Sequence, residues 1–154
     1  METYEIRPET AADSDDVCNL ALALLSELFP DTYTVEQLRP VTERILQESE
    51  DVFPFIAICD GQPVGLIVLN QCTAIYALGD FGEISELFVD PTLRSSGLGA
   101  KLIEKAVEFA QSKSWTMLEV GAPDVPRWQR TVDFYLRSGF WEIGPRLYRS
   151  FVDV

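Results

Sequence analysis

The stretch that decides the fold is Glu83-Ile-Ser-Glu-Leu-Phe-Val-Asp-Pro-Thr-Leu-Arg-Ser-Ser-Gly-Leu-Gly-Ala100. Its first half is a largely apolar run that predicts a strand, which Asp90-Pro91 ends. A turn with two glycines follows, and a helical pattern begins at once. The apolar stripe of that helix consists of Leu98, Leu102, Ile103, Ala106, Val107 and Ala110. Strand, glycine turn and helix therefore come in immediate succession.

The turn between strand and helix predicts a binding site for a bulky anion. The first N–H groups of a helix have no partner within the helix, and the positive end of its dipole lies behind them. Gly97 and Gly99 let the backbone adopt positive φ and approach a ligand closely, so that successive N–H groups form a nest. Arg94 adds a permanent positive charge. We therefore expect a diphosphate to bind at this turn.

Two common phosphate-binding motifs do not fit the turn. No Gly-Lys-Ser/Thr follows, which excludes a Walker loop. Gly97-Leu-Gly99 also lacks the third glycine of a dinucleotide fingerprint and the acidic residue about 20 positions further on. The diphosphate therefore belongs to another class of ligand.

The pattern Arg94-x-x-Gly97-x-Gly99-Ala100 resembles the Q/R-x-x-G-x-G/A motif of the GNAT superfamily of N-acetyltransferases. Downstream, Phe134-Tyr-Leu-Arg-Ser-Gly-Phe140 resembles the F-Y-x-x-x-G-F segment of the same superfamily. The resemblance implies an α/β (α+β) fold in one domain over residues 1–154. It further implies a mixed, mostly antiparallel sheet of about six to seven strands with about four helices, in the order β-α-α-β-β-β-α-β-α-β-β.

Local patterns place the other elements of this order. Thr34 opens a capping box for a helix that reaches about Glu48, and Pro40 predicts a break or a late start within it. Gly139 predicts a left-handed helix cap. The remaining predicted elements are a strand at 4–7, a helix ending at Pro30, strands at 54–59 and 64–70 joined by a turn at 60–63, a strand at 116–120, a helix at 127–138, and one or two closing strands at 140–152.

The resemblance also implies acetyl-CoA as co-substrate, with no metal. In the family the pantetheine arm lies along the strand before the loop, here at Leu87, Phe88 and Val89. The residues expected to hold the diphosphate are Arg94, Ser95, Ser96, Gly97, Leu98, Gly99 and Ala100.

Four residues are candidates for the chemistry. Tyr135 matches the tyrosine with which the family protonates the leaving thiolate, although it also falls on the apolar stripe of its helix. Glu86, Glu83 and Glu119 lie in strands and are candidate bases, because a carboxylate that loses water there gains a higher pKa. A water chain without a dedicated base is the alternative, and each glutamate could instead face solvent or pair with an arginine.

The amino-acid composition excludes some catalytic mechanisms and indicates the cellular compartment. The chain has no histidine, which excludes triads and zinc sites that depend on it. Its three cysteines match no metal or redox spacing and sit in apolar runs, so we expect buried free thiols in a cytoplasmic protein. The chain contains no run of 18 apolar residues, so we expect no membrane-spanning helix.

The net charge and its distribution along the chain indicate which classes of partner can bind. The net charge is −13, which makes nucleic acid a poor partner. Residues 1–70 hold 14 acids and 3 bases (−11), whereas residues 71–154 hold 11 acids and 9 bases (−2). The acidic half favours a cationic acceptor, with Asp31, Tyr33, Glu36 and residues 48–51 as candidates to attract it. A generally acidic surface is the plainer interpretation.

The function expected from the resemblance is acetyl transfer from acetyl-CoA to a primary amine of a cationic small molecule or peptide. The alternative is an acyl-CoA sensor or interaction module of the same fold that does not turn over. A homodimer stays open, because dimers are frequent in families of this kind.

Overall fold

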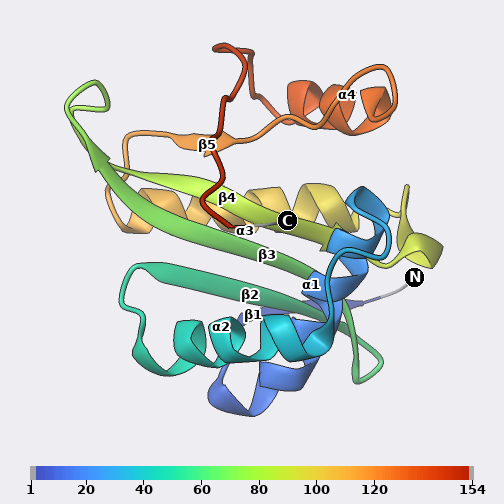
Figure 1. Ribbon diagram of the computed structural model, residues 1–154. Helices are drawn as coiled ribbons and strands as arrows, with labels where there is room; N and C mark the ends of the chain where they lie inside the picture. The colour runs from blue at the N-terminus through green and yellow to red at the C-terminus, as the bar shows by residue number, and fades with distance from the viewer. Residues whose placement is uncertain (1–2, 153–154) are drawn as a thin grey trace. The chain divides into compact units, whose positions relative to one another are not determined.

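The computed structural model describes residues 3–152 (Figure 1), and the chain divides between Glu119 and Val120 into two compact units. The first unit carries most of the sheet and three helices, and the second carries the fourth helix. Each unit is described by itself below.

The sheet has five strands in the order β1-β2-β3-β4-β5. They are β1 (Tyr4–Pro8), β2 (Val52–Cys59), β3 (Gln62–Ala74), β4 (Gly79–Val89) and β5 (Leu118–Val120). Strands β1 to β4 pair antiparallel. The Thr116 amide donates to the Asp80 carbonyl and the Gly82 amide to the Met117 carbonyl, both at 3.0 Å. These bonds advance in the same direction along both segments, so β5 runs parallel to β4 and the predicted mixed sheet is confirmed.

The helices are α1 (Ser14–Leu28), α2 (Val35–Glu48), α3 (Leu98–Ser112) and α4 (Gln129–Arg137). Leu20 of α1 belongs to a buried cluster with Ile56, whereas Phe109 of α3 packs edge-on against Phe55 at 5.2 Å. Adjacent strand residues point to opposite faces, so α1 and α3 cover opposite faces of the sheet (Figure 1). Within residues 3–152, no helix combines the length and the apolar character that crossing a membrane requires.

The start of α2 confirms one local prediction and corrects another. The Thr34 hydroxyl accepts from the Gln37 amide at 3.3 Å, and the Gln37 side chain accepts from the Thr34 amide at 2.9 Å. The predicted break at Pro40 is wrong, because Pro40 lies inside the helix. Its missing N–H removes one bond to the Glu36 carbonyl, and both residues are exposed, so water can satisfy that carbonyl.

The turn between β2 and β3 has the predicted hairpin form. Asp60 and Gly61 have φ of 50° and 75°, the sign that a two-residue type I′ turn requires at both positions. Cys59 therefore pairs directly with Gln62 across the turn.

The expected closing strands are absent, and the count of six to seven strands is wrong. No strand forms over residues 140–152, the end of the part that the structure describes, so the sheet has five strands. Gly144, at φ 132°, and Pro145 interrupt this segment, and Pro145 has no N–H for a ladder. Trp141 and Leu147 are among its exposed side chains, so strand-forming residue types do not by themselves make a strand.

The cysteines only partly match the expected burial. All three are free thiols, and Cys18 is buried, but Cys59 and Cys72 are only partly buried.

Gly82 marks the closest approach between β4 and the segment before β5. A Cβ atom at this position would lie 2.5 Å from the Trp115 ring and 2.8 Å from the Leu118 side chain. Such distances do not occur between real atoms, so only glycine fits here without a shift of the neighbours. The Trp115 indole also donates to the Gln71 side chain at 2.9 Å, which fixes the ring over the sheet.

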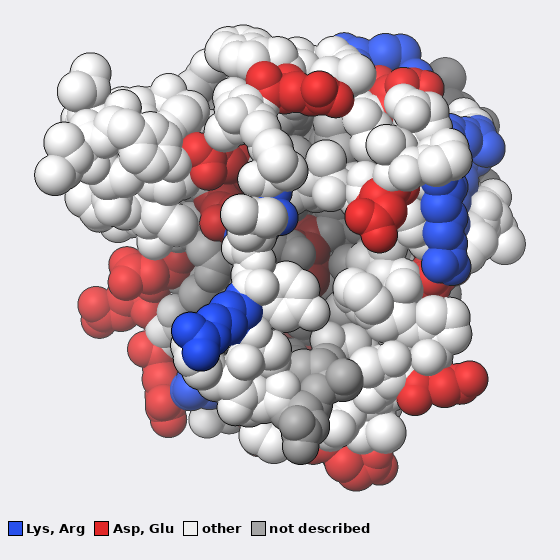
Figure 2. Space-filling view, turned by 45° about the horizontal axis from the view of Figure 1, so that its top comes forward, with Lys and Arg blue, Asp and Glu red and all other residues white. Residues whose placement is uncertain are grey.

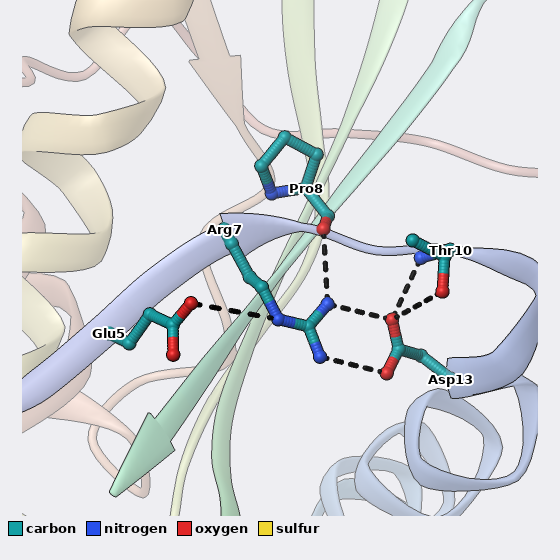
Figure 3. Close-up of polar contacts among 5 residues, drawn as sticks. All are labelled: Glu5, Arg7, Pro8, Thr10 and Asp13. Atoms are coloured by element: carbon teal, nitrogen blue, oxygen red, sulfur yellow. Dashed lines mark hydrogen bonds and ion pairs between the residues drawn. The ribbon is translucent and has the colours of Figure 1, made fainter.

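An ion pair ties β1 to the start of α1 (Figure 3). The Arg7 guanidinium donates to both carboxylate oxygens of Asp13, at 2.8 and 3.0 Å. The Thr10 amide donates to the same carboxylate at 2.8 Å. The Arg7 hydrogen bond is the main cause that lowers the pKa of Asp13 to about 2.

Glu9, four residues before Asp13, has the opposite environment. Both of its carboxylate oxygens are buried, and neither has a hydrogen-bond partner among the described residues. Burial, followed by the charge of Asp13, raises the pKa of Glu9 to about 8. The residue lines a cavity of about 190 Å³ with Ile45 of α2 and Phe53 of β2 among its walls.

These two carboxyl groups predict a stability that falls on both sides of about pH 4. Asp13 has a lowered pKa, so its contribution is complete above 3.8 and is lost as pH falls through about 2. Glu9 has a raised pKa, so the folded chain binds more protons than the unfolded one between pH 4.5 and 8, and stability falls over that range.

Glu9→Gln is therefore expected to leave the unfolding temperature unchanged near pH 4 and to raise it above pH 8, by the equivalent of about 1–2 kcal/mol. Thermal unfolding followed by circular dichroism between pH 4 and 9 measures this difference. Glu5→Gln, at an exposed position of β1, is the matched control. If Glu9→Gln changed the unfolding temperature by the same amount at every pH, the raised pKa of Glu9 would be contradicted.

Candidate active site

β4 carries one extra residue at Ser85. Val68 of β3 lies opposite Glu86, but the next residue, Leu69, lies opposite Ile84. Ser85 therefore has no partner of its own, which is the definition of a β-bulge.

The bulge decides which way the candidate bases point. Glu83 and Glu86 are an odd number of residues apart, and in a regular strand they would point to opposite faces. Glu83 lies opposite Asn70, and Glu86 lies opposite Val68. Asn70 and Val68 are two residues apart on β3 and share a face, so the bulge brings both glutamates to that face. Val68 packs in the buried cluster under α1, so this is the α1 side of the sheet.

Glu86, a candidate base, is partly buried in β4. Burial raises its pKa, and the nearby charge of Glu83 adds to that, whereas a hydrogen bond from Ser85 opposes them. The Ser85 hydroxyl donates to Glu86 Oε2, and the Asn70 amide nitrogen donates to Ser85 Oγ at 2.8 Å. Glu86 is thus a half-buried carboxylate with a raised pKa, the state that suits a general base near neutral pH.

Glu119 belongs to the same electrostatic neighbourhood. Its carboxylate accepts a hydrogen bond from the Tyr76 hydroxyl at 2.7 Å, and this bond is the main cause that raises the pKa of Tyr76. Burial raises the pKa of the Cys72 thiol, and the charges of Glu83 and Glu119 raise it further. The structure therefore groups the three predicted glutamates, with Glu83 acting both on Glu86 and on Cys72.

The loop before α3 has positive φ at one of the two glycines expected to adopt it: Gly97 does, whereas Gly99 lies in the first turn of α3 without it. Ser95 and Gly97 have φ of 71° and 92°, and α3 begins at Leu98. The Lys101 amide donates to the Gly97 carbonyl at 3.1 Å, as the first regular turn of the helix requires. Over residues 3–152, no amide of residues 97–100 donates a well-formed hydrogen bond to a backbone carbonyl. These amides are available to an anionic ligand.

Arg94 is held beside this loop by three contacts. Its guanidinium donates to Glu27 Oε1 of α1 at 2.6 Å and to the Val89 carbonyl at 3.1 Å. It also lies 5.7 Å from the centre of the Phe88 ring. Arg94 therefore already binds one anionic group, a carboxylate from the same chain.

β3 pairs with Leu87, Phe88 and Val89 along one edge of β4. β5 has only three residues, and the bonds that lead into it start at Asp80 and Gly82. The partners of β5 therefore come before Leu87, and β5 itself does not extend along these three residues.

Residues 20–140 match the acetyltransferase (GNAT) family. The chain belongs to this family. The match covers the glycine loop and the segment from Phe134 to Phe140 together, the two motifs that the sequence resemblance rested on.

Individual members of the GNAT family share about a third or less of their residues with this chain. The chain is 31% identical over 147 residues, 92% of its length, to an uncharacterized N-acetyltransferase of Methanocaldococcus jannaschii, and spans 62% of that relative. It is 28% identical over 145 residues to an aminoalkylphosphonate N-acetyltransferase of Salmonella typhimurium, covering 91% of this chain and 86% of the relative. An aminoglycoside N-acetyltransferase solved in complex with CoA superposes with a TM-score of 0.79 at 19% identity, covering 99% of this chain and 97% of the other. That likeness shows the GNAT fold.

The second unit of this GNAT chain contains Tyr135. Its ring is buried in α4 and packs against Phe134 at 5.5 Å and Phe140 at 5.7 Å between ring centres. Burial raises the pKa of Tyr135 to about 12. Gly139, at φ 97°, provides the predicted left-handed cap after the helix. The role of Tyr135 as a proton donor stays a prediction.

Sequence reasoning missed four residues around the GNAT site: Glu27, Asn70, Tyr76 and Ser85. Glu27 meets Arg94 across 67 positions of the chain, and Tyr76 meets Glu119 across 43. No local pattern reports contacts of this separation. Ser85 did lie within the informative stretch, but only the strand register reveals that it is a bulge.

Proposed function

We propose that this chain is an N-acetyltransferase that moves the acetyl group of acetyl-CoA onto a primary amine of a cationic small molecule or peptide. The observation that carries the proposal is the nest at residues 97–100, which follows the strand that presents Glu86 after one short 3-10 helix (Pro91–Leu93). Family membership supports the same reaction.

The residues of the loop suit the diphosphate of CoA. The amides of residues 97–100 supply donors, and Arg94 supplies a positive charge that already donates to a carboxylate. Leu87, Phe88 and Val89 offer backbone groups along which a pantetheine arm would add like a further strand. Bound acetyl-CoA would supply an activated acetyl group as its thioester.

The remaining chemistry is proton movement. An alkyl amine has a pKa of about 10.4 and is mostly protonated at neutral pH, so a base must take its proton before nitrogen attacks the carbonyl carbon. We assign this to Glu86, directly or through one water, and place Glu83 and Glu119 as alternatives. A C–N bond forms, the C–S bond breaks, and the leaving sulfur receives a proton from Tyr135. The second proton, which nitrogen loses after the attack, restores the phenol, so the products are the amide, the CoA thiol and the one proton that the base removed from the ammonium group.

Charge favours a cationic acceptor. Residues 1–70 carry −11, and acidic side chains (red) recur across the face shown in Figure 2, with basic ones (blue) between them. Such a field draws cations toward the chain and raises their encounter rate. The Salmonella typhimurium relative is named for an aminoalkylphosphonate, whose phosphonate is anionic, so that compound class is the contrasting candidate.

The direct test measures thiol release from acetyl-CoA with a panel of spermidine, an aminoglycoside, a lysine-containing peptide and an aminoalkylphosphonate. We expect acceleration by at least one cationic amine, and a smaller effect of the phosphonate. Tight CoA binding without acceleration by any amine would favour the sensor instead. Acceleration by the aminoalkylphosphonate alone would still show that the chain is an enzyme, but the acceptor would then carry an anionic group and the proposed cationic class would be wrong.

Arg94→Glu is expected to weaken CoA binding about 10- to 100-fold, because it places a negative charge where the phosphates would bind. Isothermal titration calorimetry with CoA measures the dissociation constant. An unchanged constant would refute the nest as the CoA site.

Glu27→Gln is the matched control, because it removes the carboxylate that Arg94 binds at 2.6 Å and leaves the cation in place. We expect CoA to bind this variant as tightly as the wild type, or more tightly. Equal weakening by both substitutions would mean that the ion pair holds the loop together and that the charge of Arg94 does not contact CoA.

A further inference from the structure

Ser85 stands between two polar side chains at the bulge in β4. The Asn70 amide nitrogen donates to Ser85 Oγ at 2.8 Å, and the Ser85 hydroxyl donates to Glu86 Oε2. Asn70 lies on β3, opposite Glu83, so the chain of contacts crosses from one strand to the next. The bulge makes this possible, because Ser85 has no partner of its own on β3.

The direction of these hydrogen bonds is fixed by the groups themselves. A serine hydroxyl has one proton, and an ionised carboxylate can only accept. Once Asn70 donates to the oxygen of Ser85, the single proton of Ser85 is directed at Glu86. If the Asn70 amide were turned over, its oxygen would accept the hydrogen bond from the Ser85 hydroxyl. The half-buried Glu86 carboxylate would then lose its donor, which costs free energy.

The surroundings of Glu86 otherwise disfavour its charge. On β4 its charged neighbour is Glu83, which repels it. On β3 this face carries Val68 and Asn70, which do not titrate, and Cys72, whose thiol keeps its proton at neutral pH because burial raises its pKa. On α1, which covers this face, Glu27 is paired with Arg94. The hydroxyl of Ser85 is the group that opposes burial and repulsion.

We propose that Ser85 is a positioning residue whose hydroxyl, held by Asn70, orients the Glu86 carboxylate and keeps it ready to accept a proton from the amine. The inference rests on the proposed function of Glu86 as the base. It assigns a role to the bulge: the extra residue brings a donor to the side of the base.

The test compares Ser85→Ala with Ser85→Thr, which keeps the hydroxyl and suits a strand. Ser85→Ala is expected to lower kcat/KM at pH 6 about tenfold, with a much smaller loss at pH 9, because the acid limb of the pH profile moves to higher pH. Ser85→Thr is expected to restore most of the wild-type profile. Thr73→Val, which removes a strand hydroxyl bonded to Asp80 instead, is the matched control and should leave the profile unchanged.

Asn70→Ala tests the order of the contacts. It is expected to produce part of the Ser85→Ala effect on its own and to add nothing in the Ser85→Ala background, because both act through the same hydroxyl. Additive losses would contradict a serial arrangement and overturn the role of Asn70.

A titration of the Glu86 carboxyl carbon by NMR separates this inference from the proposed function. Ser85→Ala should raise the pKa of Glu86, whether or not any amine is acetylated. An unmoved titration overturns the inference, whatever the turnover. If the wild type turns over no amine, the proposed function fails, and the titration alone decides whether Ser85 holds Glu86.

Discussion

Glu86→Gln is expected to lower amine-dependent turnover about 100- to 1,000-fold and to leave the affinity for CoA unchanged. The substitution keeps the size of the side chain but removes its ability to take a proton, a loss typical of a general base. Its position supports the size of the effect: the carboxylate is half-buried, its pKa is raised, and it lies in the strand that leads into the glycine loop. Steady-state rates with the best amine, together with calorimetry for CoA, measure both quantities.

Glu83→Gln and Glu119→Gln are the controls for this prediction. Both glutamates are near Glu86 or its neighbours, so each substitution changes the local charge and removes no base if Glu86 is correctly assigned. We expect losses below about tenfold from either. A large loss from one of them would move the assignment to that residue, and full turnover in all three variants would indicate a water chain.

Tyr135→Phe is expected to lower kcat about 100-fold while CoA binds as in the wild type. Burial raises the pKa of this phenol to about 12, so it keeps its proton at neutral pH and can donate to the sulfur that leaves. The substitution removes one oxygen and retains the ring that packs against Phe134 and Phe140, so stability should change little.

Tyr148→Phe serves as the control in the same unit, because its side chain is 90% exposed. Wild-type turnover in Tyr135→Phe would mean that this tyrosine only packs. A parallel fall in kcat and in the unfolding temperature would point to lost structure and would also remove the case for proton donation.

Local sequence patterns predicted the elements that depend on a few neighbouring residues. The capping box of Thr34 and Gln37 needs only side chains three positions apart, and the positive φ of Asp60 and Gly61 follows from their residue types. The positive φ at Gly97 was likewise readable, because glycine is the residue that adopts it without strain.

The sequence did not predict features that depend on distant partners. The odd spacing of Glu83 and Glu86 suggests opposite faces until the register with β3 reveals the bulge. Pro40 was expected to break α2, but an exposed carbonyl can turn to water and the helix continues. The closing strands were predicted from strand-forming residue types alone, but Gly144 and Pro145 interrupt the segment, and Pro145 has no N–H for a ladder.

The missing side chain at residue 82 has a consequence far from its own position. Any larger residue there would press on Trp115 and Leu118, and the displaced segment leads directly to Glu119. The hydrogen bond between Glu119 and Tyr76, at 2.7 Å, is then expected to change as well. A hydrogen atom in place of a methyl group at residue 82 therefore lets the segment that carries Glu119 pack as closely as it does against β4.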